Sequence, residues 1–237
     1  MTRILFICHG NICRSPMAEL ILKDMVSRIG KADGFFIDSA ATSSEELGNP
    51  VYPPARRMLE SHGISCEGKY ARKFRKEDYG AFDLILGMDE ENMYYMMHKF
   101  AGDPEGKIHN LLDFAGRPGA EIADPWYTGD FQATWEDLQV GCLALLNALN
   151  GDRPVTLDFT DCTERAELFS LMRDRMLWDE SYGGGLDALY DVLTGLPHYG
   201  MRFALVPPED PRLWDYFERL RKVFFDAGAL YEPEPEN

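Results

Sequence analysis

Short apolar runs alternate with amphipathic segments along the first 150 residues of the chain. The apolar runs resemble buried strands, and the amphipathic segments have the spacing of helices that bury one face. The runs lie at residues 3–8, 35–40, 83–88 and 107–114. The helical segments lie at residues 15–28, 54–62, 89–99 and 131–149. Strands that alternate with helices predict an α/β fold with a mainly parallel sheet.

This pattern breaks at residues 150–154, where Asn-Gly-Asp-Arg-Pro combines two turn formers with a proline. It then restarts with strands and helices at residues 155–159, 163–176, 186–193, 202–206 and 211–227. We therefore expect two domains, residues 1–150 and a small α/β domain at residues 151–237. The end of the chain is rich in Pro and Glu, which predicts a disordered acidic tail.

Composition narrows the class of protein. No apolar run approaches the ~20 residues that a membrane span needs, and the chain starts in a strand-like run without a signal peptide. The net charge of −16 argues against a nucleic-acid partner, whose phosphates it would repel. We expect a cytoplasmic protein with no membrane partner, in which the five cysteines are free, catalytic or redox-active.

One segment between a predicted strand and a predicted helix has the form C-x5-R-S. It reads Cys8, His9, Gly10, Asn11, Ile12, Cys13, Arg14 and Ser15. The first N–H groups of a helix have no intrahelical partner, and with the helix dipole they form an anion site. Gly10 is expected to let the backbone curl, and Arg14 adds a planar two-pronged donor for phosphate oxygens. The segment therefore predicts a phosphate-binding loop that needs no metal or other cofactor.

The same loop suits a nucleophile. It stabilises the anion of a thiol, so we expect Cys8 to be a thiolate that attacks a bound phosphate. Ser15 is placed to donate to the sulfur and ease its departure. A leaving alcohol also needs a proton. Asp124 is the best candidate for this general acid because Pro125 stiffens the backbone after it, although an Asp-Pro pair alone is more often a turn.

Four segments together resemble the low-molecular-weight protein tyrosine phosphatases, in order and spacing, over residues 1–149. They are CHGNICRSP from Cys8, DSAATSS from Asp38, MDEEN from Met88 and DPWYTGDF from Asp124. The resemblance implies that family's fold, a four-stranded parallel sheet flanked by helices. It also implies a tyrosine-phosphorylated protein substrate and a cysteinyl-phosphate intermediate on Cys8. Asp124 would protonate the leaving tyrosine and then activate water.

The resemblance assigns further residues by their positions. Asn11 and Ser15 match residues that support the loop, and Asp89 matches an acidic residue that helps to hold the tyrosine-bearing loop. Cys13 matches a neighbour that forms a reversible disulfide with the nucleophile, which would protect Cys8 from overoxidation.

Three positions depart from the family's pattern. Glu45 and Glu46 fall near the rim position where many relatives carry Trp or Tyr, and Lys69 falls where a His is frequent. Two carboxylates at the rim would repel an acidic phosphopeptide, so the substrate preference is open.

Three other functions compete with that of a tyrosine phosphatase. A phosphoarginine phosphatase shares the fold but tends to carry Thr where Ile12 stands. A thioredoxin-coupled arsenate reductase needs two further cysteines near the end of the third strand, and Leu84–Asn92 contains none. A non-enzymatic binding protein is opposed by the intact set of Cys8, Arg14 and Asp124.

The second domain contains an acidic helix. Its apolar face is predicted to comprise Leu186, Leu189, Val192 and Leu193. Asp187 and Asp191 are four residues apart and share an exposed face with Tyr190. By composition alone this is an ordinary acidic helix face, and a cationic partner would relieve the repulsion between the carboxylates.

Residues 154–228 also resemble barstar, the inhibitor of a secreted bacterial ribonuclease. The resemblance implies that the acidic helix binds a ribonuclease or another basic protein. The implied surface comprises Asp187, Tyr190, Asp191, Thr194 and Gly195. Ser181 stands where an aromatic residue is frequent, and the family's last strand is expected to be missing because the chain runs into the Pro-Glu tail.

Overall fold

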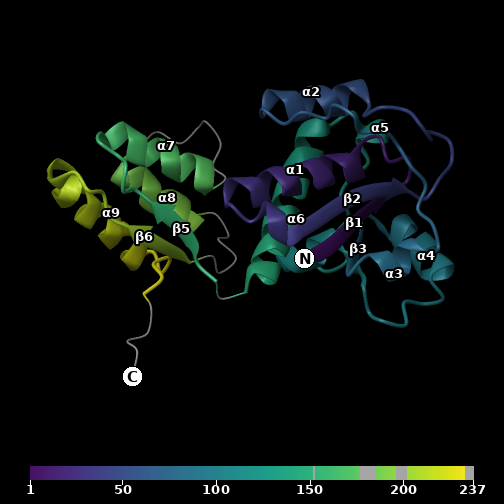
Figure 1. The fold of residues 1–237 in the computed structure, drawn as a ribbon. Coiled ribbons are helices and arrows are strands. Elements are labelled where there is room, and N and C mark those ends of the chain that lie inside the picture. Colours follow the sequence, from purple (N-terminus) through teal and green to yellow (C-terminus); the bar gives the residue numbers. More distant parts are fainter. Residues whose placement is uncertain (152, 177–184, 196–201, 233–237) are drawn as a thin grey trace. The chain divides into compact units, whose positions relative to one another are not determined.

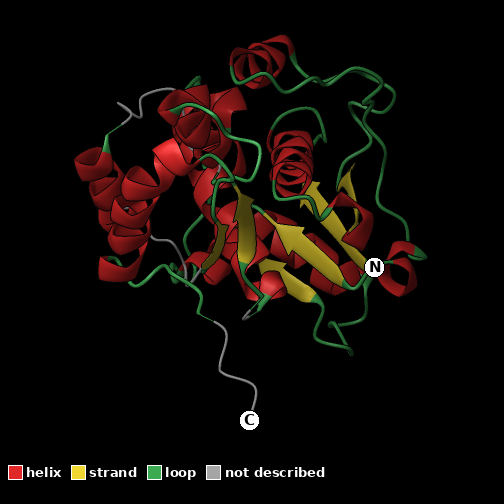
Figure 2. Cartoon of the chain, turned by 60° about the vertical axis from the view of Figure 1, so that its left-hand side comes forward, coloured by secondary structure: helices red, strands yellow, loops and turns green. Residues whose placement is uncertain are grey.

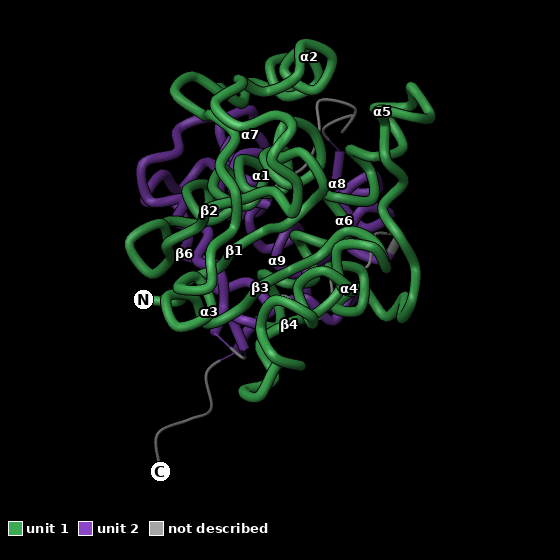
Figure 3. Tube along the Cα trace, turned by 90° about the vertical axis from the view of Figure 1, so that its right-hand side faces the viewer, with its two compact units in different colours: residues 1–148 green, residues 149–237 purple. Residues whose placement is uncertain are grey.

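The computed structural model describes residues 1–151, 153–176, 185–195 and 202–232. Contacts divide the chain into two compact units, residues 1–148 and 149–237, which are coloured separately in Figure 3. The division falls in the last turn of a helix that ends at Asn150. Each unit is described by itself. In the described part of the chain, no helix is long and apolar enough to cross a membrane.

Unit 1 is a parallel sheet with helices on its two faces (Figures 1 and 2). Its strands are β1 Thr2–Cys8, β2 Phe35–Ala41, β3 Leu84–Gly87 and β4 Ile108–Asn110. Its helices are α1 Arg14–Arg28, α2 Pro53–Ser61, α3 Asp78–Ala81, α4 Glu90–Lys99, α5 Pro125–Thr128 and α6 Phe131–Asn150, with 3-10 turns η1 Ala32–Gly34 and η2 Leu111–Ala115. The strands pair in the order β2-β1-β3-β4, all parallel. The predicted four-stranded parallel sheet flanked by helices is confirmed.

Alternate side chains of β1 face opposite sides of the sheet, as strand geometry requires. Leu5 and Ile7 belong to a buried cluster that also contains Met96 and Phe100, from α4 and the residue after it. On the other face α1 packs against β1 and β2. Helix α6 contacts α1, since the Cys142 thiol lies 3.6 Å from the carbonyl oxygen of Ala18. Both faces of the sheet are therefore covered, and functional side chains can only lie at its ends.

The fourth strand is shorter than predicted. Residues 107–114 were expected to be extended, but β4 ends at Asn110 and η2 follows. Asn110 caps this turn, since its side chain accepts from Leu112 N at 3.0 Å while Asp113 accepts from Asn110 N at 3.3 Å. This reciprocal cap stabilises a helical turn over continued strand.

Unit 2 is a smaller α/β unit. Its elements are β5 Val155–Asp158, α7 Arg165–Arg175, α8 Leu186–Gly195, β6 Phe203–Val206, η3 Pro211–Leu213 and α9 Trp214–Asp226. The strands β5 and β6 pair in parallel, and α8 packs against α9. The core includes Phe159, Phe203 and Phe224, none more than 1% exposed.

The sequence led us to expect that the last strand of unit 2 is missing. A remnant of this strand is present. Leu230 forms a single parallel bridge with Phe203. Phe203 N donates to Ala229 O at 2.8 Å, and Tyr231 N donates to Phe203 O at 2.8 Å. The strand is thus reduced to one bridge before the prolines begin. The predictions made for Ser181 and for the acidic tail at residues 233–237 lie outside the described residues.

Candidate active site

The carboxyl ends of β1 and β3 meet at one edge of the sheet, and the C-x5-R-S segment lies there. Cys8 is the last residue of β1, and Arg14 is the first of α1. The left-handed residue in the loop is Asn11, with φ of 57°. A Cβ atom at Gly10 would lie 3.3 Å from Glu46 Cγ, so a larger residue there would press on a side chain at the rim of the site.

The Cys8 sulfur receives hydrogen bonds from the loop. Its Sγ lies 3.0 Å from Ser15 Oγ and 3.3 Å from the backbone N–H of Asn11, which donates to it. Cys8 is 3% exposed. The backbone N–H of Asn11 donates to the sulfur, and the Ser15 hydroxyl is able to donate to it as well, which is the arrangement expected around a nucleophilic thiol.

Arg14 lies beside the sulfur between two carboxylates. Its two terminal nitrogens lie 2.5 Å from Asp89 Oδ2 and 2.5 Å from Asp124 Oδ2. Burial alone would lower the pKa of Arg14, but the charges of Cys8, Asp124 and Asp89 raise it above its usual value. Asp89 also caps α4 by accepting from Asn92 N at 2.7 Å. Asp89 thus orients the guanidinium of Arg14, and the link to the tyrosine-bearing loop that the family resemblance implies for Asp89 stays a prediction.

Asp124 is the N-cap of α5, and its second oxygen accepts from Trp126 N at 3.0 Å. The cap leaves Oδ2 on the side of Arg14. Trp126 and Tyr127 follow and are 53% and 84% exposed. The Trp126 ring packs on Tyr52 with centroids 5.0 Å apart. An acid group and two aromatic side chains thus stand together above the loop.

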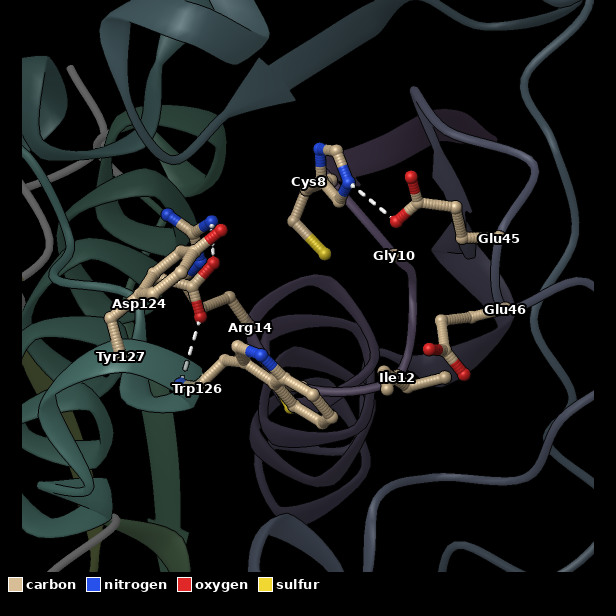
Figure 4. Close-up of a pocket in the computed structure, with 11 residues that line it drawn as sticks. Cys8, Gly10, Ile12, Arg14, Glu45, Glu46, Asp124, Trp126 and Tyr127 are labelled. Carbon is tan, nitrogen blue, oxygen red and sulfur yellow. Dashed lines mark hydrogen bonds and ion pairs between the residues drawn. The ribbon is translucent and has the colours of Figure 1, made fainter.

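These residues enclose a pocket (Figure 4). Asp124 and Trp126 lie on one side of the Cys8 sulfur, with Glu45 and Glu46 on the other. Glu45 Oε2 is 3.3 Å from His9 Nε2, and Glu46 Oε2 accepts from Asn49 at 2.7 Å. The structure therefore brings the predicted loop, the predicted acid and both acidic rim residues to one place. No group of three or more metal-ligating side chains occurs among the described residues.

Cys13 lines the same pocket but differs from Cys8 in character. It is 5% exposed and packs with Ile12 and Ala71. Burial, followed by the charge of Cys8, raises the pKa of the Cys13 thiol well above its usual value. Cys13 is therefore a neutral thiol at neutral pH.

The acidic helix of unit 2 is α8. Leu189 and Leu193 are buried, whereas Asp187, Asp191 and Thr194 are exposed and Tyr190 is 43% exposed. The Thr194 hydroxyl donates to the Tyr190 carbonyl at 2.8 Å. Gly195 is the last helical residue. The two carboxylates and the aromatic ring thus share one exposed face.

Comparison with known proteins identifies unit 1. A family model described as low molecular weight phosphotyrosine protein phosphatase matches residues 3–155. The chain belongs to this family. The low molecular weight protein-tyrosine-phosphatase YfkJ of Bacillus subtilis is 34% identical over 154 residues, 65% of this chain and 99% of that protein. The crystal structure of YfkJ matches with a TM-score of 0.62 over 63% of this chain and 95% of that one.

A second solved structure similar to unit 1 bears a different name. A crystal structure described as a Drosophila arginine phosphatase matches with a TM-score of 0.58 and 30% identity, over 65% of this chain and all of that one. For unit 2, a family model described as barstar, the barnase inhibitor, matches residues 153–235. The resemblance of both parts, predicted from their motifs, is confirmed.

The arsenate reductase alternative needs further cysteines near the end of β3, where Gly87 stands. A Cβ atom at Gly87 would lie 2.8 Å from the terminal methyl group of Met96, so that flexible side chain would have to shift to admit a larger residue. Cys8 and Cys13 are the cysteines among the residues that line the pocket. These observations disfavour the arsenate reductase alternative, which needs further thiols within reach of the nucleophile.

The family resemblance assigned Asn11 and Ser15 to the support of the loop, but sequence reasoning missed the partners of Asn11 and the backbone partner of Arg14. Asn11 is 1% exposed and bonds Ser39 and the backbone of Arg72, while Arg14 donates to the carbonyl of Ile122 at 3.1 Å. Ser39 lies inside the DSAATSS segment, which indicates the family but does not predict the hydrogen bond between Ser39 and Asn11.

Proposed function

We propose that unit 1 hydrolyses phosphotyrosine in proteins through a cysteinyl-phosphate intermediate. The observation that carries the proposal is the Cys8 sulfur, which receives loop hydrogen bonds at the base of a pocket bordered by Arg14 and Asp124. The loop N–H groups and Arg14 bind the phosphate oxygens. The sulfur attacks phosphorus, and the bond from phosphorus to the tyrosine oxygen breaks as that oxygen takes a proton from Asp124. Asp124 then takes a proton from water, which attacks phosphorus and breaks the bond to sulfur.

The Arg14–Asp124 contact supports the acid role of Asp124. In the free protein the Asp124 carboxylate is bound to the Arg14 guanidinium, which is also the group that would bind a phosphate. A dianionic phosphate ester would displace the Asp124 carboxylate from Arg14. The negative charge of the ester beside Asp124 would then favour the protonated form of that carboxyl group. Substrate binding would thus produce the acid that the first step consumes.

The free cysteines are consistent with a protein that acts in the reducing cytoplasm.

Purified protein should hydrolyse a phosphotyrosine peptide in the presence of EDTA, and a matched phosphoarginine peptide at least about tenfold less efficiently by kcat/KM. The reason is the apolar pocket lining supplied by Ile12 and Trp126, which suits an aryl group better than a guanidinium. The opposite preference would support the function named for the Drosophila structure. Loss of turnover in EDTA would contradict the metal-free mechanism.

Cys13 is proposed to act as the resolving thiol. Mild peroxide should inactivate the protein reversibly through a Cys8–Cys13 disulfide, detectable by mass spectrometry, because a thiolate oxidises first and a neighbouring thiol then traps the sulfenic acid. Cys13→Ser should still be inactivated but should regain much less activity with dithiothreitol. Cys66→Ser is the matched control, since Cys66 lies outside the pocket. Equal recovery of all three proteins would exclude Cys13 from this role.

Unit 2 is proposed to bind a basic protein surface through α8. Residues 151–237 carry 18 acidic and 9 basic side chains, and complementary charge speeds encounter and makes association salt-dependent. With barnase as the probe, Asp187→Asn combined with Asp191→Asn should weaken binding by at least about tenfold, as measured by calorimetry.

The control for this prediction is Asp215→Asn combined with Glu218→Gln. This pair removes two exposed carboxylates from α9 and changes the net charge equally. If both double variants lost the same affinity, bulk charge would explain binding. If the unchanged protein failed to bind barnase at low salt, a ribonuclease of this kind would be excluded as the partner.

A further inference from the structure

The segment that carries Asp124 is fixed by an aromatic contact that has no part in the proposed reaction. The backbone N–H of Trp126 donates to Asp124 Oδ1 at 3.0 Å, so the place of Trp126 sets the direction of the carboxyl group. The Trp126 ring packs on the ring of Tyr52, with centroids 5.0 Å apart and planes at 54°. Tyr52 is not among the residues that line the pocket, so any effect it has on the reaction passes through its neighbours.

Tyr52 is itself attached to the phosphate-binding loop. Its backbone N–H donates to the carbonyl oxygen of Ile12 at 2.8 Å. Its side chain packs against the buried cluster of Ile12, Cys13 and Ala71. On its other side Tyr52 precedes the two prolines that begin α2, and a residue before proline is restricted to extended backbone, as its φ of −55° and ψ of 133° show. The Tyr52 backbone is therefore held from both sides, and its ring has a defined place relative to the loop.

Phe131 contacts the same ring from the far end of the acid-bearing segment. It is the first residue of α6, and its ring centroid lies 6.1 Å from that of Tyr52. Phe131 also packs against the buried cluster that Tyr52 covers. Between Trp126 and Phe131 the chain turns at Gly129, whose φ of 70° ends α5. The segment thus meets Tyr52 at two rings, one on each side of this turn.

The contact matters most once a substrate is bound. In the free protein the Asp124 carboxyl group contacts Arg14 through Oδ2 and Trp126 N through Oδ1. A phosphate ester would take the place of the carboxylate on Arg14, so the orientation of the acid would then depend on Trp126. A general acid must lie within hydrogen-bond reach of the leaving oxygen, and a small misplacement costs much of its effect on the rate.

We propose that Tyr52 is a positioning residue for the general acid. Its ring holds Trp126, and Trp126 keeps the Asp124 carboxyl group at the distance from the phosphate-binding loop that proton transfer requires. The inference rests on the proposed acid role of Asp124. A leucine at position 52 would keep the backbone hydrogen bond to Ile12 but would present no ring to Trp126.

The test compares kcat/KM for phenyl phosphate, whose leaving group needs a proton, with kcat/KM for p-nitrophenyl phosphate, whose leaving group does not. Tyr52→Leu should lower the value for phenyl phosphate by about tenfold and the value for p-nitrophenyl phosphate by at most about twofold. Tyr52→Met serves the same comparison if the leucine variant does not fold. Tyr52→Phe keeps the ring and should retain both values. Tyr94→Leu is the matched control, since Tyr94 also packs on a tyrosine ring but lies outside the pocket.

A double variant separates positioning of the acid from a wider disturbance of the site. Asp124→Asn has no acid left to misplace, so adding Tyr52→Leu should lower its kcat/KM for phenyl phosphate by no more than about twofold further. The rate of Cys8 alkylation by iodoacetamide, located by mass spectrometry, should be the same in Tyr52→Leu as in the unchanged protein, because the phosphate-binding loop keeps its backbone contacts.

Three results would overturn the proposal. The first is an unchanged ratio of the two kcat/KM values in folded Tyr52→Leu, whether both fall or neither does, since Tyr52 would then serve the fold only. The second is an equal loss in Tyr52→Phe and Tyr52→Leu, which would exclude the ring contact as the cause. The third is a tenfold loss in the Asp124→Asn background or an altered rate of Cys8 alkylation, either of which would mean that Tyr52 acts elsewhere than on the acid.

Asp124→Asn alone tests the proposed function separately. If this variant lost the same activity with both leaving groups, Asp124 would not be the acid, and this inference would fail together with that role. If Asp124→Asn distinguished the leaving groups but Tyr52→Leu did not, the proposed function would stand and this inference alone would be wrong.

Discussion

Replacement of Cys8 by serine should lower kcat for a phosphotyrosine peptide by at least about 10⁴-fold. A hydroxyl loses its proton far less readily than a thiol, so the loop that stabilises a thiolate cannot supply an alkoxide nucleophile at neutral pH. The phosphate-binding groups remain in Cys8→Ser, because Arg14 and its two carboxylates do not depend on the sulfur for their positions.

The measurement is rapid acid quench with radiolabelled substrate, which should trap a phosphoenzyme in the unchanged protein and none in Cys8→Ser. Cys66→Ser is the matched control. It is a half-buried cysteine outside the pocket, and its substitution should leave both the intermediate and kcat intact. A Cys8→Ser protein that kept more than a hundredth of the wild-type turnover would assign the nucleophile to another group.

The sequence predicted the arrangement of the site because its two parts follow from local rules. A strand followed by a helix places the residues between them at the carboxyl edge of a parallel sheet. Cys8 and Arg14 lie there. Asp124 was found through its Asp-Pro pair, and the pair forms the cap and first residue of α5.

The same local rules could not predict how the loop is held. Gly10 was expected to let the backbone of the loop curl, but the residue of the loop with a positive φ is Asn11. The amide of Asn11 makes three contacts, to Ser39, Ser15 and Arg72, that a glycine could not make. Ser15 lies 4 residues from Asn11 along the chain, but Ser39 and Arg72 lie 28 and 61 residues away. Only tertiary structure brings such distant groups together, and the strain of a positive φ is offset there by buried hydrogen bonds.

For the two rim carboxylates, the sequence showed that the residues are unusual for the family, but only the fold shows where they lie. Glu45 and Glu46 were noted as departures from the family, and both line the pocket beside the loop. Glu46 is held in place by Asn49 and packs against Gly10. We expect their charges to act on residues that flank the phosphorylated side chain of a substrate, since Asp124 lies on the opposite side of the Cys8 sulfur (Figure 4). The rim therefore bears on substrate choice and not on the chemistry.

Asp124→Asn should separate the two chemical steps. The amide cannot donate a proton to a leaving phenolate, so the first step should slow by about 10²–10⁴-fold for a phosphotyrosine peptide. It should slow much less for p-nitrophenyl phosphate, whose leaving group departs without a proton. The second step loses its base with either substrate. The variant should therefore release a burst of about one equivalent of p-nitrophenol per site, followed by slow turnover.

The KM should also fall in Asp124→Asn. A carboxylate 2.5 Å from Arg14 competes with the phosphate dianion in the free protein, and its neutral replacement competes less. Asp130→Asn is the matched control, because Asp130 lies outside the pocket. Its side chain caps the start of α6 by accepting from Ala133 N at 2.9 Å, and asparagine caps a helix equally well. Stopped-flow absorbance with both substrates distinguishes the outcomes. An equal loss for the two leaving groups without a burst would mean that Asp124 orients Arg14 but transfers no proton.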